Sequence, residues 1–130
     1  MKRDMDLIRE LLLKLEALPM RPGDIVLLDT NDTEMQVDGY STDQIDYHLA
    51  LIREAQLIEA PGRGSMDGRI TFRRLSWAGH DFLDSIRNPD VWAKTKAGAL
   101  AAGGFTMELL RDLAKGFIKK QIEDRTGIKL

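Results

Sequence analysis

The sequence predicts an α+β protein that is mainly helical, and two observations support this fold class. Apolar residues recur every three or four positions over several long segments, which is the spacing of amphipathic helices. Shorter apolar runs lie between these segments and are bounded by Gly, Pro, Asn and Asp, which is typical of short strands and turns. We expect a single domain over 1–130, with a core over 1–88 and a helical extension over 89–130.

The first helix is expected over 4–18, where the apolar positions form one continuous stripe. Pro19 ends it, because proline lacks the N–H group that a continuing helix needs. The following segment, 19–40, is expected to hold one or two short strands joined by a polar turn. The first strand is predicted at 25–28, which is an apolar run, and the second at 34–37, which alternates.

A second helix is expected directly after Ser41. Ser41 is followed three residues later by Gln44, which is the spacing of a capping box, and Tyr40 with Ile45 has the spacing of a hydrophobic staple. This helix is expected to fray at 55–56.

A β-hairpin is the next predicted feature. Its strands are expected at 57–60 and 69–75, and the Gly-rich segment 61–68 between them forms the turn. Ser76 then begins a helix that ends at Asn88.

Two further helices are expected in the C-terminal part of the chain. Asn88 followed by Pro89 is a helix start, and that helix is predicted to run to about Ala102. Thr106 opens the last helix, which is expected to end around Gly127.

The order helix, strand, helix, Gly-rich hairpin, helix is that of a winged helix. Segment 45–59, with Tyr-His-Leu at 47–49 and Ala-Gln-Leu-Ile-Glu at 55–59, resembles the recognition helix and first wing strand of bacterial winged-helix regulators. In those proteins a Tyr-His-Leu and an Ala-Gly-Leu-Ile-Glu pattern are common. Segment 75–83 resembles the Leu-Thr-x-x-Gly-x-x-Phe-Leu pattern that closes their wing. The resemblance implies a winged-helix-like core.

A narrower resemblance covers most of the chain. Segments 1–8, 39–41, 47–49 and 91–96 resemble an uncharacterised family of bacterial and phage-associated domains of unknown function. This resemblance implies a fold, whereas function has to be argued from the site itself.

The composition excludes several classes of protein. There is no cysteine, so disulfides, thiolate nucleophiles and cysteine-bound zinc are excluded, and a reducing cytoplasm suits the chain. The apolar runs are much shorter than the ~20 residues of a membrane-spanning helix. We therefore expect a cytoplasmic protein with no membrane partner. Its net charge of −2 differs from the basic excess that is usual in nucleic-acid-binding domains.

Double-stranded DNA is nevertheless the first expected partner, and the protein would then be a small regulator. The recognition helix would bring three side chains to the bases, and the wing would hold the phosphates with arginines. The alternative for these arginines is pairing with Asp43, Asp46 or the acidic segment 24–38 of the same fold. The predicted base-reading residues are Gln44, Tyr47 and Arg53, and the predicted backbone-binding residues are Arg63, Arg69, Arg73 and Arg74.

A protein-interaction module with a degenerate winged helix is the alternative. Segment 19–40 lacks the helix that precedes an ordinary recognition helix, and 24–38 holds five acids and no base. The exposed face of the recognition helix would carry Asp43, Asp46 and Glu54, which repel phosphate. The C-terminal helices are expected to offer a homodimer seam.

We expect neither catalysis nor a cofactor or metal. No catalytic or phosphate-binding motif occurs in the sequence, and a lone histidine such as His48 or His80 is more often a packed side chain than a ligand. Trp77 and Trp92 each lie near the start of a predicted helix, where an indole commonly anchors packing, so both are expected in the core.

Overall fold

The computed structural model describes residues 1–62 and 69–130, and the chain divides into two compact units, Met1–His80 and Asp81–Leu130. Each unit is described by itself. Residues 63–68 of the Gly-rich turn of the predicted hairpin, including Arg63, lie outside the described residues.

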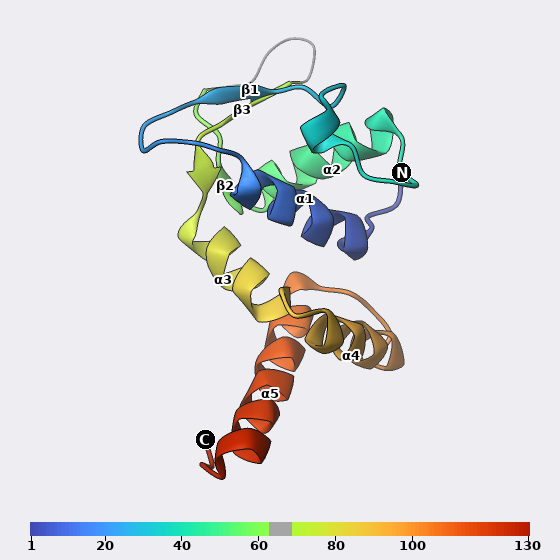
Figure 1. Ribbon diagram of the computed structural model, residues 1–130. Helices are drawn as coiled ribbons and strands as arrows, with labels where there is room; N and C mark the ends of the chain where they lie inside the picture. Colours follow the sequence, from blue (N-terminus) through green and yellow to red (C-terminus); the bar gives the residue numbers. More distant parts are fainter. Residues whose placement is uncertain (63–68) are drawn as a thin grey trace. The chain divides into compact units, whose positions relative to one another are not determined.

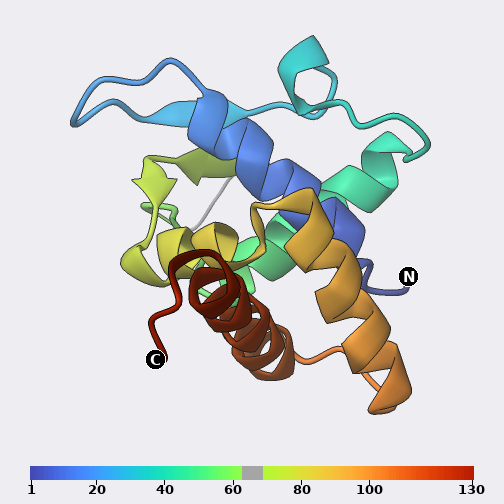
Figure 2. The same ribbon diagram turned by 60° about the horizontal axis from the view of Figure 1, so that its bottom comes forward.

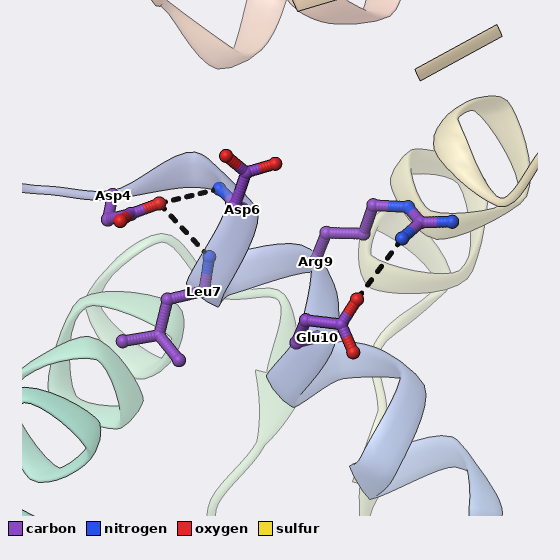
Figure 3. Close-up of polar contacts among 5 residues, drawn as sticks. All are labelled: Asp4, Asp6, Leu7, Arg9 and Glu10. Carbon is purple, nitrogen blue, oxygen red and sulfur yellow. Dashed lines mark hydrogen bonds and ion pairs between the residues drawn. The ribbon is translucent and has the colours of Figure 1, made fainter. Parts of the chain in front are cut away.

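Helix α1, Met5–Ala17, opens the first unit, as expected from its apolar stripe. One carboxylate oxygen of Asp4 accepts the backbone N–H groups of Asp6 and Leu7 at 2.9 and 3.2 Å, which satisfies two donors at the helix start (Figure 3). On the next turn, Arg9 pairs with its neighbour Glu10 (Figure 3). The apolar side of α1 packs against helix α2, Thr42–Glu54, and strand β4, Arg74–Leu75.

The segment after α1 contains one strand, β1, Val26–Leu28, and one short 3-10 helix, η1, Thr33–Met35. The strand predicted at 34–37 is therefore wrong. Local hydrogen bonds explain the difference, because Asp29 accepts both the backbone and side-chain N–H groups of Asn31 and so begins a series of turns. Met35 is the buried residue of η1 and anchors it to the core.

Helix α2, Thr42–Glu54, begins with the capping box that the sequence predicted. The Ser41 hydroxyl accepts the backbone N–H of Gln44, and the Gln44 side chain accepts the backbone N–H of Ser41. The helix buries one face, which includes Ile45 and Ile52. It ends where Gln56 takes a left-handed backbone conformation with φ 59°.

Three short strands complete the sheets of this unit (Figure 1): β2, Ile58–Glu59, β3, Ile70–Phe72, and β4, Arg74–Leu75. Strand β4 pairs antiparallel with β2, as the hairpin prediction requires, whereas β3 pairs antiparallel with β1. The chain from Ile70 to Leu75 thus joins two segments that are far apart in the sequence. The predicted layout of helix, short strand, helix, paired strands and helix is confirmed, except that the single strand predicted at 69–75 is divided into β3 and β4.

Helix α3, Trp77–Ile86, follows the wing, and its start is capped by the Ser76 hydroxyl, which accepts the Gly79 N–H at 3.0 Å. The same hydroxyl donates to the carbonyl of Gln56 at 2.6 Å, so it also ties the helix start to the end of α2. Trp77 is 84% exposed, so its predicted place in the core is wrong. As the first residue of the helix, Trp77 is directed to solvent while Phe82 is buried further along.

Helices α4, Pro89–Ala101, and α5, Met107–Thr126, pack against each other within the second unit (Figure 2). Asn88 caps α4, and Gly127 ends α5 with φ 72°, as predicted. Trp92 is 4% exposed, which confirms its expected place in the core. No helix within 1–62 or 69–130 is long and apolar enough to cross a membrane.

Candidate functional site

The residues predicted to read DNA bases lie on α2, and two of the three are engaged within the protein. The Gln44 side chain accepts the Ser41 N–H at 2.8 Å, so its carboxamide serves as part of the helix cap. A guanidinium nitrogen of Arg53 donates to the carbonyl of Gly62 at 2.7 Å, which joins α2 to the beginning of the wing. Tyr47 is 37% exposed and contacts the ring of His48 edge to face. Of the three, Tyr47 best offers its side chain to a partner.

The predicted phosphate-binding arginines of the wing differ in their surroundings. Arg74 forms an ion pair with Glu59 across the β2–β4 ladder, at 2.7 Å between Nε and Oε2. Arg69 is exposed at the beginning of the returning strand. Arg73 is half-buried, and its Nε atom is buried without a hydrogen-bond partner among the described residues. Arg63 lies outside the described residues, so the structure brings together part of the predicted set.

The solvent face of α2 is acidic, as the sequence predicted. Asp43, Asp46 and Glu54 are all exposed on this helix, beside Ala50. Phosphate groups approaching this face would meet like charges, which raises the free energy of groove insertion.

A polar joint connects α1 to α2 and uses His48, which is 1% exposed. The backbone N–H of Asp4 donates to His48 Nε2 at 2.8 Å, so Nδ1 carries the hydrogen and donates to the carbonyl of Gln44 at 2.7 Å. The Tyr40 hydroxyl donates to the other carboxylate oxygen of Asp4 at 2.8 Å. Both ring nitrogens thus form hydrogen bonds within the protein, and the side chain is buried, as expected of a lone histidine.

The environment of the joint changes the chemistry of Tyr40. Burial, the hydrogen bond to Asp4 and the negative charge of that carboxylate raise the pKa of Tyr40 from 10.0 to about 12. Sequence patterns give little sign of this joint, because its partners lie 36 and 44 residues apart.

A groove of about 240 Å³ lies between the end of α1, strand β1 and η1. Its apolar lining includes Leu18, Met20 and Met35. Asp32 and Glu34 add carboxylates to its lining, and Asp29 contributes a third. The acid-rich segment 24–38 is evident in the sequence, but the groove beside it was not predicted. The available signal was the apolar run directly before these acids.

Elsewhere, no group of three His, Asp or Glu side chains in the described part of the chain is arranged to hold a metal ion.

Within the described residues, these features define a mainly helical α+β fold with two small antiparallel sheets and a groove beside the first strand. The chain belongs to the DUF2513 family of hypothetical proteins, whose model matches residues 2–105. It is 33% identical over 124 residues to an uncharacterized protein of Haemophilus influenzae (strain ATCC 51907 / DSM 11121 / KW20 / Rd), which covers 94% of this chain and 99% of that protein. No solved structure matches the chain. The predicted membership of an uncharacterised family is confirmed.

Proposed function

We propose that this protein is a non-enzymatic domain that binds another protein. The observation that supports the proposal is the internal use of side chains that DNA recognition would need. Gln44 caps α2, Arg53 bonds to the Gly62 carbonyl, and Arg74 is paired with Glu59. Freeing them for DNA would break contacts that hold α2 and the wing in place.

The charge distribution supports the same proposal. Nucleic-acid affinity comes largely from lysines and arginines that release counterions from phosphate. Here the exposed side of α2 presents Asp43, Asp46 and Glu54, and the whole chain has a net charge of −2. A basic protein surface complements this charge better than a phosphate backbone. The absence of cysteine suits a protein that acts in the reducing cytoplasm.

A small DNA-binding regulator is the second candidate. The order of helices and wing strands favours it. This candidate requires Tyr47 to approach bases while the wing arginines hold phosphates. It predicts binding that weakens steeply as salt is added.

A salt titration against random duplex DNA separates the two candidates. Fluorescence anisotropy would compare the intact protein with a variant in which Arg63, Arg69, Arg73 and Arg74 are replaced by Ala. A matched control removes four exposed bases of α5 instead: Lys115, Lys119, Lys120 and Arg125. We expect no saturable binding at physiological salt in any of them. A steep salt slope that the wing variant alone flattens would overturn the proposal.

Photo-crosslinking in the native cell tests the protein-binding proposal directly. A photoreactive amino acid would replace Tyr47 on α2 or Leu27 on β1, which are 37% and 43% exposed. We expect a discrete protein adduct from at least one position, which excess unlabelled domain removes. Adducts to nucleic acid, with none to protein, would refute the proposal.

A further inference from the structure

We infer that the outer edge of β1 and the groove beside it bind an extended segment of the partner protein, in which apolar and basic residues alternate. The inference rests on the proposed function and assigns its binding site to one surface. Three observations lead to it: an unpaired strand edge, a groove of side-chain size and an acidic rim.

The strand edge is available for pairing. β1 pairs with β3 on one side (Figure 1), and no strand within 1–62 or 69–130 pairs with its other side. The residues at this edge are apolar and yet exposed: Ile25 is 49% exposed, Val26 36% and Leu27 43%. Unpaired backbone groups on an edge strand accept an added strand, and apolar side chains there favour the burial that accompanies it.

The groove gives the added strand an anchor point. At about 240 Å³ it is smaller than the ~300–1,000 Å³ of a usual small-molecule pocket, so it suits one or two aliphatic side chains. Met20 and Met35 contribute to its lining together with Leu18. Methionine side chains adjust to irregular shapes, so the groove can accept more than one type of aliphatic side chain.

The rim determines the charge of the occupant. Asp32 and Glu34 are exposed. The Asp32 side chain accepts no capping hydrogen bond from η1, so its carboxylate is available to an incoming cation. Asp29 is partly used, because its carboxylate accepts from Asn31. Segment 24–38 holds five acids and no base, so lysines or arginines that flank the anchor residue are attracted and acidic partners are repelled.

Peptide binding tests the site with a defined probe. The probe is a fluorescein-labelled peptide in which Lys alternates with Val around a central Leu, and its affinity is measured by anisotropy. The groove variant carries Asp32→Asn and Glu34→Gln, and the control variant carries Glu108→Gln and Asp112→Asn, two exposed positions of α5. The loss of two exposed charge pairs predicts an affinity loss of about five-fold for the groove variant, with little change for the control.

A second probe tests the strand pairing. The same peptide with N-methyl groups on alternate residues keeps its side chains but loses the donors that pair with β1, so we expect its binding to fall at least as much. Equal binding of both peptides, or equal losses in the two variants, would overturn the inference.

Gel filtration gives a third check, because a dimer that Leu27→Lys dissociates would assign the edge to a second copy of this chain. Crosslinks from position 47 but none from position 27 would refute this site and leave the proposed function standing.

Discussion

At the scale of single residues, Gln56 occupies a backbone conformation that side chains disfavour. Its φ of 59° lies at the turn between α2 and β2, where the winged-helix regulators that this segment resembles have Gly. A left-handed conformation costs an L-residue about 1–2 kcal/mol relative to glycine. The carbonyl of Gln56 accepts the Ser76 hydroxyl, and this bond does not involve the Gln56 side chain.

Replacing Gln56 by Gly is therefore expected to raise the free energy of unfolding by about 0.5–1 kcal/mol. The matched control is Ala55→Gly, because Ala55 has φ −74° and gains nothing from glycine. The control is expected to lower stability by a similar amount. Urea titrations would measure both, and a loss of stability in Gln56→Gly would contradict the argument.

Gly79 is needed for close packing between α3 and the segment before β2. A Cβ atom at this position would lie 1.9 Å from the carbonyl oxygen of Leu57, which is backbone and cannot turn away. Gly79→Ala is expected to destabilise the protein by about 2–3 kcal/mol, because α3 must shift. Gly116→Ala is the control, since a Cβ there meets nothing within 4 Å. Gly116→Ala should raise the free energy of unfolding by ~0.5–1 kcal/mol, because alanine has a higher helix propensity than glycine. Equal urea midpoints for Gly79→Ala and Gly116→Ala would contradict the requirement for glycine at position 79.

Tyr40 makes the stability of the first unit sensitive to high pH. Its pKa in the folded protein is raised to about 12 from 10.0, by burial and by the contact with Asp4. The unfolded chain therefore loses this proton first, so stability is complete below pH 10 and falls as the pH rises through about 12. Tyr40→Phe should remove this part of the pH dependence. Urea midpoints of the intact protein and of Tyr40→Phe would be measured from below pH 10 to about pH 12. The same pH dependence in both proteins would contradict this role of Tyr40.

At the scale of elements, the helices that could be predicted from the sequence are those whose ends are set by local hydrogen bonds. Ser41, Asn88 and Thr106 each cap a helix as expected, because the side chain and the N–H groups it accepts are within three residues of each other. The 3-10 helix η1 was missed, since alternation at 34–37 was outweighed by the turn that Asp29 begins. The pairing of β1 with β3 was also not predicted, because strand partners distant in sequence leave no local pattern.

The candidate site shows the same limit. The sequence identified which arginines and acids are present, but it could not show that Arg74 faces Glu59 or that Arg53 reaches Gly62. These contacts depend on the register of the wing and on how α2 meets it. The groove beside β1 depends on the packing of three separate segments, so composition alone indicated only its acidic charge.

The two tryptophans provide a test at the level of α3 and α4. Trp77 is 84% exposed and Trp92 is 4% exposed, so acrylamide should quench part of the fluorescence strongly and the rest weakly. Trp77→Phe is expected to remove the strongly quenched part, whereas Trp92→Phe should leave it. Linear quenching plots of equal slope for both variants would contradict the placement of Trp77.

At the scale of the whole molecule, charge is distributed unevenly along the chain. Segment 24–38 has five acids and no base, whereas 111–130 has six bases and three acids. The acidic segment lies in the first unit, beside the groove, and the basic segment is largely α5 in the second unit. The small net charge of −2 therefore conceals two regions that would attract different partners.

The pairing of β1 with β3 also bears on how fast the chain folds. Val26 pairs with Phe72, so the first unit must close a long loop before this ladder forms, and loop closure slows folding. In the second unit, α4 and α5 are joined by the short segment 102–106, so their contacts form between neighbours in the chain. Stopped-flow refolding of the Trp77→Phe variant, in which Trp92 is the remaining tryptophan, should therefore show an early phase in fluorescence, followed by a slower phase in circular dichroism. The chain would then acquire its C-terminal helical pair while the edge of β1 is still unformed, so the surface proposed for partner binding would be among the last to mature.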